Sequence, residues 1–241
     1  MTPDDHHKPW ETTRRGLLLL VSSPAGAGKT SLTRRLVADH SDLTLSISAT
    51  TRAARPGEEE GREYYFKTRP EFEAMIEAGA FLEWAVVNGN YYGTPKAPVM
   101  AALEGGHDVL FDIDWQGAAQ IAEKAPDDSV RLFILPPAWD DLERRLRARA
   151  QDTEQTIRDR LELGREEILH WANYDYVIVN KNFDRAYADL GHIYRAERMK
   201  PGRNSWLPGF VDDLLADAAK ADPPASEPTP PKSLLLRPVQ K

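Results

Sequence analysis

The sequence contains no cysteine among its 241 residues, which excludes both a disulfide framework and a thiolate metal site. It also lacks a long apolar run, since the longest, residues 17–21, is far shorter than the roughly 20 residues that span a bilayer. The polar stretch "MTPDDHHKPWETTRR" offers no apolar core of an export signal. We therefore expect a cytoplasmic protein that makes no use of a membrane.

Positive charge is scarce as well. The chain has 31 Lys and Arg against 38 Asp and Glu, a net charge of −7, so a broad basic surface for nucleic acid is not expected. Any arginines that bind phosphate must be gathered locally. The six histidines show no metal-ligand spacing and receive no catalytic role. With 41% hydrophobic residues, the chain can bury the core of one domain with insertions or of two small domains.

Apolar strand-like runs alternate with amphipathic helical stretches along most of the chain. The predicted strands cover residues 16–22, 43–49, 107–114, 130–135 and 176–180. The predicted helices cover residues 29–39, 139–150, 153–171 and 184–199. This alternation predicts an α/β fold, with a central, mostly parallel sheet covered by helices on both faces.

Two segments depart from this alternation. The aromatic-rich runs "REYYF", "FLEWAVV" and "NYYG" surround one helical stretch, which predicts a small insert with a partly antiparallel sheet of its own. After Met199 we recognise no helical period. The final 21 residues hold six of the 18 prolines, which is typical of a disordered tail.

The segment "SSPAGAGKTS", residues 22–31, lies between a buried strand and a helix, as a phosphate-binding loop requires. Its glycines allow backbone N–H groups to surround a phosphate, its lysine can reach the β- and γ-phosphates, and its threonine can hold Mg²⁺. Ser23 replaces the first glycine of the usual G-x-x-x-x-G-K-[ST] pattern. An ordinary helix cap is the alternative. The predicted ATP-binding residues here are Ser23, Pro24, Ala25, Gly26, Ala27, Gly28, Lys29, Thr30 and Ser31.

Two further segments carry candidate site residues. Arg52 and Arg55 follow a predicted strand and could bind a second phosphate, although a solvated basic turn is the alternative. Asp112 and Asp114 are two apart at the carboxyl end of a predicted strand and would share one face. We assign Asp112, with Thr30, to the metal. Asp114 could instead cap the helix that follows it.

Behind the loop the chain carries, in this order, "SISATTRAARPGEEEGREYYF", "FLEWAVVNGNYYGTP", "DVLFDIDWQGA" and "VIVN". With the loop, these segments resemble the guanylate kinase family, from about Leu17 to Ala196. The resemblance implies a three-layer P-loop NTPase-type fold and transfer of a phosphoryl group from ATP to GMP or dGMP with Mg²⁺. It also implies a flexible extension 1–15, a core formed by 16–46 and 96–200, a GMP-binding insert 47–95 and a lid at about 138–165. Residues 201–241 would form a C-terminal extension, disordered from about 220.

The resemblance also assigns roles by position. The GMP phosphate would meet Arg52, Arg55, Tyr64 and Tyr92; guanine would meet Ser48, Glu83, Thr94 and Asp114; and adenine would lie at Asn180. The catalytic set would be Lys29, Arg52, Arg145, Arg149 and Arg160, the last three being lid arginines. Guanine presents N1–H and an amine as donors, which the two carboxylates complement. Without the resemblance, the lid arginines would be interpreted as a solvated helix face.

Two rival functions remain open. One is a non-catalytic guanylate-kinase-like module that binds a phosphorylated partner, and the other is a kinase of a different small acceptor. The presence of Gly28, Lys29, Thr30 and the lid arginines argues against the first, and the guanine-reading set argues against the second. Lys181, directly after Asn180, departs from the family's usual acidic residue and bears on how the donor base is held. The sequence sets no oligomeric state.

Overall fold

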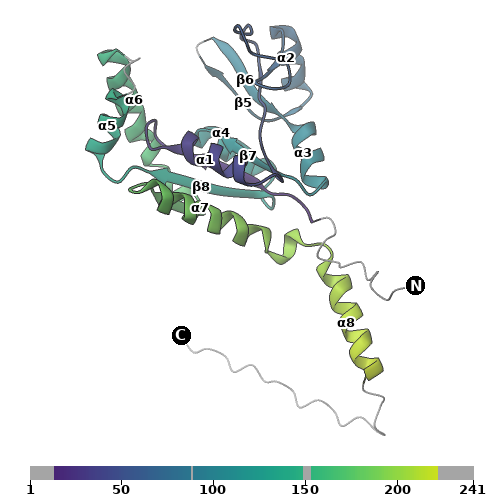
Figure 1. Cartoon of the computed structure of the whole chain (residues 1–241). Coiled ribbons are helices and arrows are strands. Elements are labelled where there is room, and N and C mark those ends of the chain that lie inside the picture. Colours follow the sequence, from purple (N-terminus) through teal and green to yellow (C-terminus); the bar gives the residue numbers. More distant parts are fainter. Residues whose placement is uncertain (1–13, 88, 149–152, 222–241) are drawn as a thin grey trace, which may run out of the picture. The chain divides into compact units, whose positions relative to one another are not determined.

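The computed structural model describes residues 14–87, 89–148 and 153–221, and Figure 1 draws the whole chain. One compact unit ends at Ser205, and the described part of a second contains Trp206–Ala221. Arg149 and the tail 222–241 lie outside the described residues, so the predictions made for them are not addressed below.

The first unit is built on a five-stranded sheet in the order β2-β7-β1-β8-β9. Every neighbouring pair in it is parallel, which confirms the predicted sheet. The strands are β1 (Leu18–Ser22), β2 (Leu43–Leu45), β7 (Asp108–Asp112), β8 (Ser129–Leu135) and β9 (Tyr176–Val179). Parallel strands end at the same edge, so the segments that follow β1, β7 and β9 meet there.

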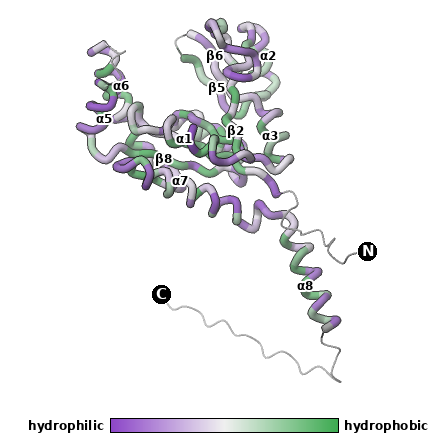
Figure 2. The backbone as a smooth tube through the Cα atoms, in the orientation of Figure 1, coloured by the Kyte–Doolittle hydropathy of each residue, from purple (hydrophilic) through white to green (hydrophobic). Residues whose placement is uncertain are grey.

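Helices cover both faces of this sheet because β1 is apolar on both sides. Leu19 and Val21 pack toward α1 (Lys29–Asp39) and α7 (Phe183–Arg198). Leu18 and Leu20, which alternate with them, pack toward α3 (Lys96–Glu104) and α4 (Trp115–Lys124). Figure 2 shows the hydrophobic colour concentrated in these central strands.

The insert forms a second, four-stranded sheet in the order β4-β3-β6-β5, beside α2 (Arg69–Glu77). Its strands are β3 (Ala49–Thr50), β4 (Tyr65–Phe66), β5 (Phe81–Val87) and β6 (Asn90–Pro95). The β5–β6 and β3–β6 pairs are antiparallel and the β3–β4 pair is parallel, as predicted for a partly antiparallel sheet. The prediction of one strand over 43–49 is wrong, because β2 belongs to the first sheet and β3 to the second. The Ser46 N–H donates to the Leu110 carbonyl of the first sheet, and the chain then crosses to the second.

Two helices, α5 (Trp139–Arg147) and α6 (Glu154–Ile168), lie side by side in Figure 1. Leu142 and Leu146, the predicted apolar seam, are fully buried against Ile157. Arg144 and Arg147 make ion pairs with neighbouring acids on the exposed side of α5.

Helix α8 (Leu207–Ala221) contradicts our statement that helical periodicity ends after Met199. Leu207, Val211, Leu214 and Leu215 follow the i, i+4, i+7, i+8 spacing of one helix face, a signal that the proline count nearby obscured. Among the described residues, no helix is long and apolar enough to cross a membrane.

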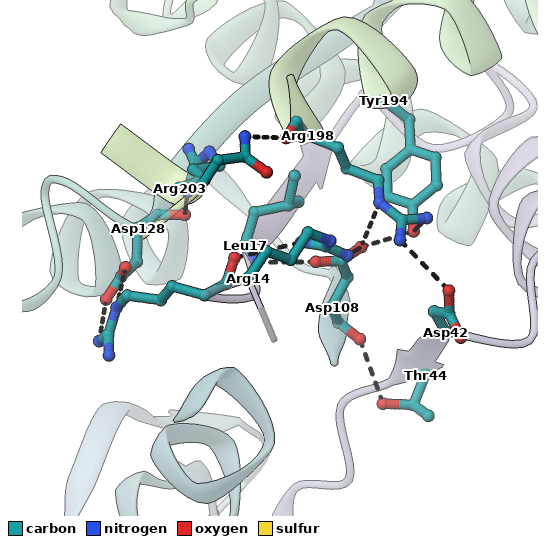
Figure 3. A network of polar contacts seen from close by, with 11 residues as sticks. Arg14, Leu17, Asp42, Thr44, Asp108, Asp128, Tyr194, Arg198 and Arg203 are labelled. Carbon is teal, nitrogen blue, oxygen red and sulfur yellow. Dashed lines mark hydrogen bonds and ion pairs between the residues drawn. The ribbon is translucent and has the colours of Figure 1, made fainter. Parts of the chain in front are cut away.

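A buried carboxylate at the start of β7 anchors the N-terminal segment and α7 (Figure 3). Asp108 is fully buried; its Oδ1 accepts the Leu17 N–H at 2.8 Å and its Oδ2 accepts the Tyr194 hydroxyl at 2.6 Å. Arg14 and Arg198 supply the positive charge. Arg14, which we placed in a flexible extension, is therefore held by the sheet.

Candidate active site

The loop between β1 and α1 has the backbone geometry of a phosphate-binding turn. Gly26 and Gly28 adopt φ values of 93° and 99°, a left-handed conformation that other residues rarely take, and Gly28 caps α1. Ser23, the departure from the usual pattern, is 8% exposed, and its hydroxyl donates to the Pro24 carbonyl at 3.1 Å. The serine side chain therefore fits within the loop.

Two α1 residues converge on the end of β7. The Lys29 ammonium lies 2.6 Å from Asp112 Oδ1 and donates to the Ile113 carbonyl at 3.1 Å. The Thr30 hydroxyl donates to Asp112 Oδ2 at 3.2 Å. The structure thus brings together the three residues predicted for the phosphate and metal side. A hydroxyl and a carboxylate are the hard oxygen donors that Mg²⁺ prefers, and Mg²⁺ usually keeps phosphate and water as its other ligands.

The loop is also tied to the segment after β9 and to α5. The Ala27 carbonyl accepts the Asn180 side-chain amide at 2.8 Å and Arg145 Nη1 at 3.3 Å. Arg145 Nη2 also donates to the Asn180 carbonyl, at 3.2 Å. The predicted lid arginine Arg145 therefore borders the phosphate loop. Arg160 lies on α6, the second helix of the pair.

In the insert, the residues predicted to hold the second phosphate form an arginine–tyrosine cluster. The Arg52 guanidinium lies over the Tyr64 ring at 5.2 Å, and the Tyr64 and Tyr92 rings meet edge to face at 6.0 Å. The Glu58 carboxylate forms two hydrogen bonds with Arg52. Arg55 is exposed and makes no side-chain ion pair or hydrogen bond with the described residues.

The residues predicted to read guanine come from four places: the segment before β3, strands β5 and β6, and the N-terminus of α4. Glu83 on β5 pairs in register with Thr94 on β6, and the Thr94 hydroxyl donates to Glu83 Oε1 at 2.8 Å. Burial raises the pKa of Glu83, and the charge on Asp114 raises it further. Ser48 precedes β3 and accepts the Tyr65 N–H through its carbonyl.

Asp114 is not part of a strand, which corrects our prediction that it shares a strand face with Asp112. Strand β7 ends at Asp112, and Asp114 Oδ1 caps α4 by accepting the Gly117 N–H at 2.8 Å. The competing interpretation, a helix cap, is confirmed. The cap uses one of the two carboxylate oxygens, so a cap and a ligand contact are compatible.

Two neighbouring carboxylates were missed by sequence reasoning. One is Glu58, which the R-P-G-E turn signal could have indicated. The other is Glu167 on α6, whose pKa is raised, mainly by burial. Nothing distinguishes Glu167 in the sequence from the exposed acids beside it on α6.

The parallel sheet, the glycine loop at its carboxyl edge and the Lys29–Asp112–Thr30 arrangement together define a P-loop phosphotransferase-type protein. The guanylate kinase family model matches residues 15–197. The chain therefore belongs to the guanylate kinase family.

Individual relatives agree with this assignment. A guanylate kinase of Caulobacter vibrioides is 57% identical over 203 residues, covering 84% of this chain and 95% of its own. One of Maricaulis maris is 54% identical over 216 residues, covering 89% of this chain and 99% of its own. The crystal structure of guanylate kinase from Anaplasma phagocytophilum aligns with a TM-score of 0.66 at 34% identity, over 84% of this chain and 97% of that chain.

Proposed function

We propose that this protein transfers the γ-phosphoryl group of ATP to GMP, giving ADP and GDP, with dGMP as a second acceptor. The observation that carries the proposal is the pairing of a phosphate loop, with Lys29 placed at its end, with an insert that presents both arginines and the buried carboxylate of Glu83. The loop suits a nucleoside triphosphate, and the insert suits a guanine nucleotide.

On the donor side, Lys29 and the loop N–H groups hold the phosphates, and Asn180 keeps the loop in shape through the Ala27 carbonyl. Thr30 and Asp112 would hold Mg²⁺, which supplies electrostatic stabilisation of the phosphates when bound. Arg145 already contacts the loop, and the lid arginines would add positive charge at the transferring group.

On the acceptor side, the phosphate would lie among Arg52, Arg55, Tyr64 and Tyr92, while Ser48, Glu83, Thr94 and Asp114 would read the base. An oxygen of the GMP phosphate attacks the γ-phosphorus, the bond from that phosphorus to the bridging oxygen breaks, and ADP leaves. No nucleophilic side chain is needed, because catalysis here is positioning and charge stabilisation.

Measuring ADP release with Mg²⁺-ATP and separate acceptors tests the proposal. We expect strong turnover with GMP, weaker turnover with dGMP, and AMP, CMP and UMP disfavoured by about 10⁴-fold, because they leave buried acceptors unpaired. GMP binding without any turnover would instead support the non-catalytic module. Turnover of another monophosphate ahead of GMP would support the rival acceptor.

The raised pKa of Glu83 predicts a pH effect on GMP affinity. Guanine donors require the carboxylate form, so the KM for GMP should rise as the pH falls, and the rise should begin at a higher pH than for a glutamate of ordinary pKa. Glu83→Gln should raise this KM by about 10- to 100-fold and leave only the acid dependence that comes from the GMP phosphate, whose second pKa is about 6. Glu77→Gln, an exposed change in α2, is the control. The same pH dependence of KM in the wild type and in Glu83→Gln would refute the role of Glu83.

A further inference from the structure

The segment from Arg52 to Glu58 is shaped by one tight turn. The Glu58 N–H donates to the Arg55 carbonyl at 3.0 Å, with Pro56 second and Gly57, at a φ of 89°, third. Proline followed by a glycine of positive φ is the signature of a type II β-turn. The turn reverses the chain, so the Glu58 side chain reaches back to Arg52, six residues earlier.

The Glu58 carboxylate is almost fully used by this segment. Its Oε1 accepts Arg52 Nη2 at 2.9 Å, and its Oε2 accepts Arg52 Nη1 at 3.0 Å and the Arg55 N–H at 2.8 Å. The hydrogen bond from Arg52 holds the pKa of Glu58 below its usual range, so the carboxylate is ionised at neutral pH. One side chain thus fixes both the guanidinium of Arg52 and the backbone of Arg55.

The hydrogen bonds of Arg52 show which of its N–H donors remain available to a ligand. A guanidinium has five N–H groups; two bond Glu58 and one bonds the Ala53 carbonyl at 2.7 Å. The two that remain, on Nε and Nη2, share one edge of the guanidinium, and the Tyr92 side chain also interacts with this arginine. That edge matches the spacing of two phosphate oxygens. The Tyr64 ring beneath the guanidinium restricts its tilt.

Arg55 behaves differently, because only its backbone is fixed. Its guanidinium is exposed and makes no ion pair or hydrogen bond with the described residues. The pocket therefore has one arginine with a preset orientation and one whose side chain is free to reach the ligand.

We propose that Glu58 is a positioning residue of the acceptor pocket: it presents the Nε–Nη2 edge of Arg52 to the GMP phosphate and sets the backbone from which Arg55 reaches it. This inference rests on the proposed function. Charge alone predicts the opposite effect, since removing a carboxylate near a phosphate site should strengthen anion binding. Whether replacing Glu58 weakens or strengthens GMP binding therefore distinguishes a positioning role from a purely electrostatic one.

The test is calorimetric binding of GMP and of guanosine, without ATP, to the full-length wild type and to Glu58→Gln. We expect the variant to bind GMP about 10- to 100-fold more weakly, because a displaced guanidinium loses its bidentate contact. Guanosine binding should stay within about twofold, because that ligand has no phosphate. In turnover, the KM for GMP should rise while kcat at saturating GMP changes by less than about threefold.

Glu63→Gln is the matched control, because Glu63 also bonds an arginine, Arg62, and a backbone N–H within the same segment. It should leave GMP binding unchanged. Equal or tighter GMP binding by Glu58→Gln would overturn the inference, and so would parallel losses of GMP and guanosine, which indicate a general structural role. Failure of the proposed function would appear in the wild type itself, as absence of GMP binding or as GMP binding without turnover.

Discussion

Replacing Lys29 with methionine is expected to lower kcat/KM for GMP phosphorylation by about 10³-fold or more. In the proposed function the Lys29 ammonium neutralises the phosphates, and its side chain is only 17% exposed between Asp112 and the Ile113 carbonyl. Methionine keeps an unbranched side chain, one heavy atom shorter, but removes its charge. The lost charge leaves phosphate oxygens unneutralised and Asp112 without its cation. Steady-state kinetics with ATP and GMP varied in turn provide the measurement.

The matched control for this experiment is Lys67→Met. Lys67 forms only a partly exposed, 3.8 Å pair with Glu60 in the insert, so its replacement should change activity by less than about threefold. Melting curves of both variants establish that each is folded. A Lys29 variant that retained activity within tenfold of wild type would mean that the loop does not hold the donor phosphates as we propose.

Asp108→Asn is expected to cost about 3–5 kcal/mol of the free energy of unfolding, the usual cost of removing one member of a buried ion pair. Asparagine would leave Arg14 and Arg198 without the carboxylate that both face. The Tyr194 hydroxyl, whose pKa is raised mainly by burial, stays protonated and would lose a charged acceptor. Urea denaturation followed by circular dichroism measures the loss.

The control is Asp175→Asn, which removes a half-exposed pair with Arg131 and should cost about 1 kcal/mol or less. Because Asp108→Asn could prevent folding, Arg14→Met provides a milder variant that removes one charged hydrogen bond, at about 1.5–3 kcal/mol. If both network variants were as stable as the control, the buried carboxylate would not be what anchors the N-terminal segment.

The sequence predicts the phosphate loop and the central sheet well, because their residue types and their local structure coincide. A buried strand, two glycines and a lysine are the signature of the loop. The glycines are needed because glycine readily adopts the left-handed backbone that the loop has directly before its helix. The central strands were found for a similar reason: continuous apolar runs such as "LLLLV" fit a sheet that is covered on both faces.

Other features depend on a choice between alternative local structures, or on contacts between distant residues, that the sequence alone does not reveal. Asp114 fits both the end of a strand and a helix cap, and the cap prevails because α4 needs an acceptor for the Gly117 N–H. The Asp108 network joins residues up to 94 positions apart, and no local pattern announces it. Helix α8, by contrast, had a visible apolar spacing that we did not use.

The contact between Gly28 and Asn180 limits how the loop could change in evolution. A Cβ at position 28 would lie 2.3 Å from the Asn180 amide nitrogen, and the φ of 99° strains any residue with a Cβ even where there is space. Shrinking Asn180 would relieve the contact but not the backbone strain, and it would remove the hydrogen bond to the Ala27 carbonyl. No substitution at position 180 therefore compensates for the loss of Gly28, which is constrained both by its backbone and by its neighbour. Sequence change near the loop should consequently accumulate elsewhere, as at Lys181, before it reaches Gly28.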